Sequence, residues 1–278
     1  MTIFQAIVLG LVQGLTEFIP VSSSAHLVLV RWLFNWPRGP EAFAFDVLVQ
    51  VGTLVAVIAY FWNDLWAIAR HVLAGLARRQ PLGTPEARLG WLVVIATVPA
   101  VVLGVLFKDF FEATFSSAAW TAVQLVLNGL LLIAAERLTR GRRGGAGGRP
   151  LETLTVTDAG VIGLAQAAAI LPGLSRSGAT ISGALGRGIE RRAGARFSFL
   201  MSIPAMLGAG VVATGDLLDL PNFGTYVLPI AVGFIAAAVV GYVCIRWLLG
   251  YLGRHSMEAF GVYCVAAGLL SLLVAWLR

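Results

Sequence analysis

Residues 13–26 read QGLTEFIPVSSSAH, and this polar stretch decides the fold because it interrupts an apolar segment at about 3–34. The proline at position 20 breaks the hydrogen-bond ladder of a helix. A second stretch, PGLSRSGAT over residues 172–180, interrupts another apolar segment at about 157–188. Non-helical backbone at membrane depth is tolerated only where protein or a water-filled cavity surrounds it. We therefore interpret each segment as a re-entrant helix pair that enters and leaves the bilayer on one side.

The composition places these segments in a membrane. Hydrophobic residues make up 58% of the 278 positions, charged residues only 12%, and the mean hydropathy is +0.85. A helix of roughly 20 apolar residues crosses the hydrocarbon core. Six further runs have this length, at about 43–62, 88–107, 118–136, 196–214, 226–248 and 257–277. The predicted fold is an all-α polytopic membrane protein with six transmembrane helices and two re-entrant helix pairs.

The basic residues predict how the chain is oriented. With both interrupted segments treated as re-entrant, fifteen arginines fall on one side of the membrane and four basic residues on the other. The positive-inside rule makes the richer side cytoplasmic and places both termini outside. Ordinary spans would instead separate the arginines at 137–149 from those at 187–196. The net charge of +6 thus reflects membrane topology, and no nucleic-acid partner is expected.

The two halves of the chain share an ordered set of short motifs. They are Gly-Leu-Xaa-Gln from residues 10 and 163, Phe-Xaa-Phe from 43 and 197, and Gly-Leu-Leu from 129 and 268. Each half has an odd number of crossings, so the halves are predicted to insert as inverted repeats whose broken helices meet near the midplane. The predicted boundaries are 1–137 and 155–278 for the repeats, with a basic, Gly-rich cytoplasmic linker at 138–154.

The first interruption carries groups for acid–base and nucleophilic chemistry. Gln13 and Glu17 are four residues apart and share one helical face. A carboxylate at membrane depth is costly and normally faces a polar cavity. Ser23 is a candidate nucleophile, and Glu17 or His26 is a candidate base or leaving-group acid. In the alternative reading, the serines at 22–24 only satisfy backbone groups freed by the proline, but this leaves the buried carboxylate and imidazole unexplained.

The second interruption supplies Arg176, the only basic residue placed well inside the membrane. Arginine stays protonated, and its fork of donors matches phosphate oxygens. The hydroxyls of Ser175, Ser177 and Thr180 and the N–H groups of the following helix extend this predicted anion site. A structural ion pair between Arg176 and Glu17 is the alternative, and it is compatible with catalysis.

Asp46 and Gln50 form a third polar pair, four residues apart on one helical face. We predict that they line the cavity or hold a cation, with a position at the membrane interface as the alternative. The full set of predicted substrate-binding residues comprises Gln13, Ser22, Ser24, Ser175, Ser177, Thr180, Asp46 and Gln50.

At its two interruptions the sequence resembles the undecaprenyl-diphosphate phosphatases, the bacterial enzymes associated with bacitracin resistance. The similarity rests on residues 13–26 and 172–180, and it is weaker over 45–52 and 196–200. It extends over nearly the whole chain, and both main motifs are long and specific. Many family members carry Glu at the position of Gln13, so this chain departs from the family there and has one carboxylate, Glu17, where those members have two.

The resemblance implies removal of the terminal phosphate of undecaprenyl diphosphate in the bacterial inner membrane, which recycles the lipid carrier for cell-wall synthesis and confers bacitracin resistance. It implies catalytic roles for Glu17, Ser23 and His26 and binding of the diphosphate by Arg176. A divalent cation, Mg²⁺ or Ca²⁺, is usual in the family, with Glu17 as its predicted ligand here. The family also implies a cavity that opens to the outside.

A lipid or small-anion transporter is the alternative function, because inverted repeats with broken helices are also transporter features. No Walker-type loop is present in the sequence, which argues against nucleotide hydrolysis. The expected partners are the bilayer and the lipid diphosphate. The sequence leaves open the oligomeric state, with a homodimer as one option, and whether Ser23, His26 or water is the nucleophile.

Overall fold

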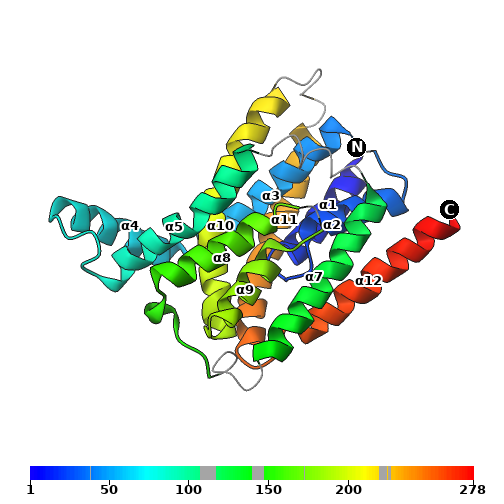
Figure 1. Cartoon of the computed structure of the whole chain (residues 1–278). Coiled ribbons are helices and arrows are strands. Elements are labelled where there is room, and N and C mark those ends of the chain that lie inside the picture. The colour runs from blue at the N-terminus through cyan, green and yellow to red at the C-terminus, as the bar shows by residue number, and fades with distance from the viewer. Residues whose placement is uncertain (38, 107–116, 140–146, 172, 219–223, 225–226) are drawn as a thin grey trace.

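The computed structural model describes residues 1–278 except 38, 107–116, 140–146, 172, 219–223 and 225–226. The described part of the chain is helical, without β-strands, and forms one bundle with both termini at the same end (Figure 1). The helices are α1 (Ile3–Thr16), α2 (Ser23–Leu33), α3 (Pro40–Tyr60), α4 (Trp62–Ala77), α5 (Pro85–Leu106), α7 (Ala118–Thr139), α8 (Val156–Ala168), α9 (Arg176–Gly186), α10 (Arg191–Leu218), α11 (Val227–Leu252) and α12 (Glu258–Leu277).

The first interruption is a true break between two helices. The segment between α1 and α2, residues 17–22, contains Pro20, which cannot donate to a helical ladder. Ser22 has a φ of +70°, and its hydroxyl accepts a hydrogen bond from the N–H of Ala25 at 3.4 Å, which caps the start of α2. This left-handed residue turns the chain into α2.

The second interruption is a break as well. It separates α8 from α9, and Gly173 within it has a φ of +102°, a conformation that glycine adopts without strain. The hydroxyl of Ser175 accepts from the N–H of Gly178 at 3.1 Å and caps α9. Pro172, to which the sequence assigns this break, lies outside the described residues. Both predicted breaks are thus confirmed, while their re-entrant path through a bilayer stays a prediction.

The spanning helices agree with the predicted apolar runs. Four of them, α5, α7, α11 and α12, are long and apolar enough to cross a membrane. The helices α3 and α4 pass this test together but are bent by 75°, and the run at 196–214 lies within α10. The chain is therefore an all-helical polytopic membrane protein, as predicted. The number of crossings and the inverted relation of the halves stay predictions.

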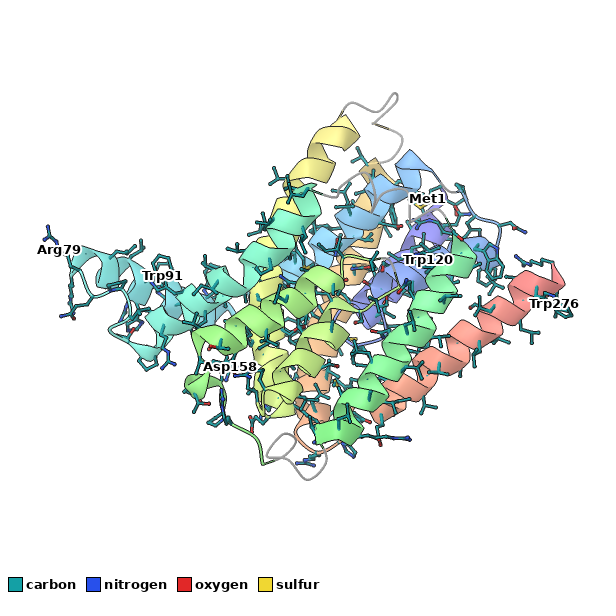
Figure 2. The ribbon with its side chains drawn as sticks, in the orientation of Figure 1. Met1, Arg79, Trp91, Trp120, Asp158 and Trp276 are labelled. Atoms are coloured by element: carbon teal, nitrogen blue, oxygen red, sulfur yellow. The ribbon has the colours of Figure 1, made fainter. Side chains whose placement is uncertain are left out.

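A helix at the position of α4 is not predicted by the sequence. It projects from the bundle together with the start of α5 (Figure 1), and Arg79 and Trp91 mark this arm in Figure 2. Asp64 in its first turn accepts a bond from Arg196 of α10 at 2.9 Å, which ties the arm to the bundle.

A buried carboxylate joins the two arginine clusters at one end of the bundle. Asp158, fully buried at the start of α8, accepts bonds from Arg149 and from Nε of Arg187, the latter at 2.7 Å. Figure 2 shows Asp158 well away from Met1. Arg149 and Arg187, one from each cluster, therefore lie at the same end of the bundle.

The predicted linker at 138–154 is shorter than expected. Helix α7 continues to Thr139, and a 3-10 turn occupies Leu151–Thr153. The N–H of Arg149 also donates to the carbonyl of Gly188 at 2.8 Å. Residues 140–146, with most of the glycines and arginines of the linker, lie outside the described residues. The repeat boundaries themselves stay predictions.

Glycines allow α7 and α12 to pack closely. A Cβ atom at Gly129 would lie 2.5 Å from the carbonyl oxygen of Gly261, and one at Gly261 would lie 2.8 Å from the carbonyl oxygen of Gly129. Small residues at such crossings let helix backbones approach one another in a membrane. The contact holds α7 in a fixed position beside the two breaks.

Replacing Gly129 by alanine is expected to destabilise the protein, because the new methyl group meets backbone that cannot move aside. Overpacking of this kind costs about 1–3 kcal/mol. The matched control is Gly160→Ala on α8, where an added Cβ meets nothing within 4 Å. Thermal unfolding in detergent should show a lower midpoint for Gly129→Ala and an unchanged or higher one for the control. Equal midpoints would contradict the close crossing.

Candidate active site

The two helix breaks meet inside the bundle. The N–H of Gly173 in the second break donates to Oγ of Ser24, just after the first break, at 3.4 Å. Glu17 is the C-cap of α1 and Arg176 is the first residue of α9. Nη2 of Arg176 donates to Oε1 of Glu17 at 2.5 Å. The two charged groups that the sequence places at membrane depth are therefore in direct contact.

Glu17 is the centre of this cluster. Its second oxygen, Oε2, accepts from Oγ of Ser23 at 2.6 Å and from Nε2 of Gln13 at 2.8 Å. The Glu17 side chain is only 3% exposed. Its carboxylate accepts hydrogen bonds from three side chains, those of Ser23, Gln13 and Arg176. A buried charge is tolerated when it is paired and hydrogen-bonded. The predicted face shared by Gln13 and Glu17 is thus confirmed as a direct contact.

Ser23 has the geometry of a nucleophile beside its base. Its hydroxyl donates to the Glu17 carboxylate, and it stands at the first position of α2, where the helix dipole favours an anion. Nη1 of Arg176 is buried and has no hydrogen-bond partner among the residues described. The cluster thus combines a hydroxyl–carboxylate pair with a guanidinium group that can accept a further anionic partner.

Comparison with known proteins agrees with this chemistry. The model of the family described as bacitracin resistance protein BacA matches residues 6–270. The chain belongs to the BacA family. Proteins named undecaprenyl-diphosphatase from Chlorobaculum tepidum, Thermomicrobium roseum and Moorella thermoacetica are each 44% identical to it. These matches cover 97%, 99% and 100% of this chain and 95%, 98% and 100% of the respective relatives.

His26 of this BacA-family chain lies apart from the Glu17 cluster. Its Nδ1 is 2.7 Å from the carbonyl oxygen of Ser22, which can only accept, so Nδ1 carries the proton. In the neutral ring Nε2 then accepts from the hydroxyl of Tyr263 at 2.8 Å. The two rings are also stacked, with centroids 5.7 Å apart. Among the described contacts, none joins His26 to Glu17, Ser23 or Arg176.

Most of the hydroxyl groups predicted to bind substrate cap helices or bond neighbouring side chains in this BacA-family chain. Ser175 caps α9 and lies 3.0 Å from Oγ of Ser177. The hydroxyl of Thr180 lies 2.7 Å from the carbonyl oxygen of Arg176 in its own helix and 2.6 Å from Oγ of Ser198 in α10. Ser22 caps α2 and lies 3.2 Å from Oγ of Ser24. Their role as ligands of the substrate stays a prediction.

Asp46 and Gln50 are not joined to the cluster by any described hydrogen bond. Asp46 pairs instead with Arg31 of α2 at 2.5 Å, and Arg31 is 5% exposed. The carbonyl of Gln50 accepts from Thr53, whose hydroxyl lies 3.3 Å from Nε2 of Gln13. Asp46 therefore braces α2 against α3, and its predicted contact with substrate is untested.

The sequence misses three residues that contact the site from other helices. Thr53 of α3 bonds Gln13, Tyr263 of α12 bonds His26, and Asn128 of α7 bonds both breaks. A single polar side chain within an apolar span is the only signal they carry, and it identifies no partner. Asn128 gives the strongest signal, because an amide at membrane depth must find hydrogen-bond partners.

The oxygens around Glu17 suit a divalent cation only in part. No three His, Cys, Asp or Glu side chains gather as a metal site in the described ranges. The carboxylate of Glu17 and the hydroxyl of Ser23 are hard oxygen ligands of the kind that Mg²⁺ and Ca²⁺ prefer, whereas Gln13 presents its Nε2 donor to Glu17. These donors are too few for a cage built from protein alone, so a bound diphosphate would have to supply the remaining oxygens.

Removing one partner of the central ion pair should cost more stability than removing both. Glu17→Leu leaves the partly buried Arg176 guanidinium without its anion, which costs up to about 3–5 kcal/mol. Adding Arg176→Met should recover part of this loss, because no unpaired charge remains. Asp64→Asn, which breaks the more exposed pair with Arg196, serves as control and should cost no more than about 1 kcal/mol.

The measurement is thermal unfolding of the wild type, Glu17→Leu, Arg176→Met, the double variant and Asp64→Asn in the same detergent. A double variant that is less stable than Glu17→Leu by the full cost of a second independent substitution would contradict direct pairing.

Proposed function

We propose that the chain is an integral membrane phosphatase that hydrolyses undecaprenyl diphosphate to undecaprenyl phosphate and inorganic phosphate. The observation that carries this proposal is the contact of one buried carboxylate, Glu17, with both the Ser23 hydroxyl and the Arg176 guanidinium. The full-length relatives named undecaprenyl-diphosphatase support the same substrate. Hydrolysis would return the monophosphate carrier to cell-wall synthesis, and the loss of the lipid diphosphate would confer resistance to bacitracin.

Arg176 binds the diphosphate in this mechanism. Its Nη1 is buried without a partner in the described structure, so it offers a donor to a phosphate oxygen while Nη2 remains near Glu17. A guanidinium group bonds phosphate oxygens through two donors at once. It also stabilises the negative charge that develops on the transferring phosphoryl group. The lipid tail can stay in the bilayer while the headgroup enters between the two breaks.

Ser23 attacks the terminal phosphorus in the proposed first step. Glu17 Oε2, which already accepts the hydroxyl at 2.6 Å, takes the proton as the P–O bond to the bridging oxygen breaks and undecaprenyl phosphate leaves. A water molecule then attacks the phosphoserine, releases inorganic phosphate, and the proton returns from Glu17 to Ser23. His26, whose Nε2 faces Tyr263, is placed to exchange protons at the edge of the site.

We further propose that a divalent cation, Mg²⁺ or Ca²⁺, binds together with the diphosphate. Glu17 would hold it, with phosphate oxygens completing its ligands. When bound, the cation neutralises charge on the phosphates. The carboxylate of Glu17 is shared with Arg176 and Ser23, so binding of a cation and binding of substrate are coupled at this residue.

The proposal places the protein in the bacterial inner membrane with its termini and catalytic site on the outer side. Its support is the distribution of arginines, fifteen of which fall on the side predicted to be cytoplasmic. A homodimer remains the assembly to be tested, by measuring the mass of the protein–detergent complex.

Purified protein in detergent is expected to release inorganic phosphate from undecaprenyl diphosphate. EDTA should suppress the release, and added Mg²⁺ or Ca²⁺ should restore it, because the negative charge of a diphosphate exceeds what the single guanidinium group of Arg176 neutralises. The measurement is colorimetric phosphate detection over time. Detergent abolishes any gradient, so protein that binds the lipid diphosphate without releasing phosphate would favour the transporter alternative.

Substitutions at the cluster should separate the roles of its members. Arg176→Ala should lower kcat/KM by about 10²–10³-fold, the usual cost of one lost transition-state donor, and Arg176→Lys should recover only part of it. Ser23→Ala should abolish a phosphoenzyme that rapid quenching of the wild type would trap. Ser271→Ala on α12, whose hydroxyl bonds only its own helix at Ala267, is the matched control.

Full retention of activity in Arg176→Ala would remove this residue from the site. Turnover in Ser23→Ala at the wild-type rate would show that water, rather than this hydroxyl, attacks phosphorus.

A further inference from the structure

One buried amide contacts both helix breaks at once. Asn128 of α7 is fully buried, and its Nδ2 donates to the carbonyl oxygen of Pro20 at 3.1 Å. Its Oδ1 accepts from the N–H of Ser175 at 3.0 Å. The carbonyl can only accept and the N–H can only donate, so the orientation of the amide is fixed by its partners.

Both partners are backbone groups that the breaks leave without a helical bond. The carbonyl of Pro20 lies in the interruption between α1 and α2, and the N–H of Ser175 lies at the N-cap of α9. Buried backbone groups of this kind need a partner from elsewhere. A primary amide supplies one donor and one acceptor a short distance apart, whereas an apolar residue at position 128 supplies neither.

The two bonds lie next to the reactive residues. Pro20 is three residues before Ser23, and Ser175 immediately precedes Arg176. A bond that fixes both backbones to one side chain therefore sets the separation between the Ser23 hydroxyl and the Arg176 guanidinium. The neighbouring residue Gly129 is held against α12, so the helix that carries Asn128 is itself a fixed support.

We propose that Asn128 is a positioning residue for the hydrolysis proposed above, aligning Ser23 with Arg176 by bonding the two breaks that carry them. No described hydrogen bond joins it to Glu17, and it acts through the backbone of Pro20 and Ser175. This inference rests on the proposed function, and it assigns to α7 a part in catalysis that no motif in the sequence indicates.

The test compares phosphate release by Asn128→Leu with release by the wild type and by Thr121→Val. Thr121 lies two turns earlier on α7 and is fully buried, and its replacement by valine removes only the bond from its hydroxyl to the carbonyl of Ser117, just before the helix. Misalignment of reacting groups by about 1 Å can cost on the order of 10²-fold in rate. We expect kcat of Asn128→Leu to fall by this order with a much smaller change in KM, and Thr121→Val to stay within about threefold of wild type.

A second pair of variants tests the same bond from its other side and does not alter Asn128. Ser175→Pro removes both the hydroxyl that caps α9 and the N–H that donates to Oδ1 of Asn128. Ser175→Ala removes only the capping hydroxyl. Ser175 has a φ of −82°, which proline can adopt. We expect kcat of Ser175→Pro to lie at least about tenfold below that of Ser175→Ala, and Asn128→Leu to add little to Ser175→Pro.

Each outcome decides the question. Folded Asn128→Leu that keeps kcat within threefold, or Ser175→Pro that equals Ser175→Ala, would overturn the positioning role. If Asn128→Leu does not fold, the two Ser175 variants alone decide. Absence of phosphate release by the wild type would count against the phosphatase proposal itself, whereas an active wild type with unaffected variants would count only against Asn128.

Discussion

A buried carboxylate paired with a partly buried guanidinium, Glu17 with Arg176, is the constraint on which the rest of the structure depends. Removing two charges from water costs more than their attraction returns unless further hydrogen bonds complete the pair. Ser23 and Gln13 supply those bonds on the carboxylate side. Regular apolar helices cannot provide such a polar environment. The chain is therefore broken before α2 and before α9, and a serine, Ser22 or Ser175, is the N-cap of each of these helices.

The surrounding helices form a frame with two kinds of contact. In the apolar middle, glycine crossings such as Gly129 on Gly261 bring backbones together without polar groups. At one end, buried carboxylates form ion pairs with arginines, as Asp158 does with Arg149 and Arg187. Such a frame holds neighbouring helices at fixed distances, which a site built from two separate chain segments requires.

The sequence is sufficient to predict the helix breaks and their meeting, and it offers the Glu17–Arg176 ion pair as an alternative, because proline and lone charges in apolar segments have few stable solutions. It does not predict the partners that come from other helices, such as Asn128, Thr53 and Tyr263, since these depend on the rotation of each helix about its own axis. Asp46 illustrates the limit. Its spacing from Gln50 predicts that it lines the cavity, yet its carboxylate forms an ion pair with Arg31.

Helix α9 is fastened at both ends and in its middle. Asn128 holds the N–H of Ser175 before its first turn, Thr180 bonds Ser198 of α10, and Arg187 after its last turn bonds Asp158. Alternating access, the working principle of transporters with broken helices, needs one such element to rock against its neighbours. A helix bonded along its length gives up that freedom and holds the Arg176 guanidinium in one place.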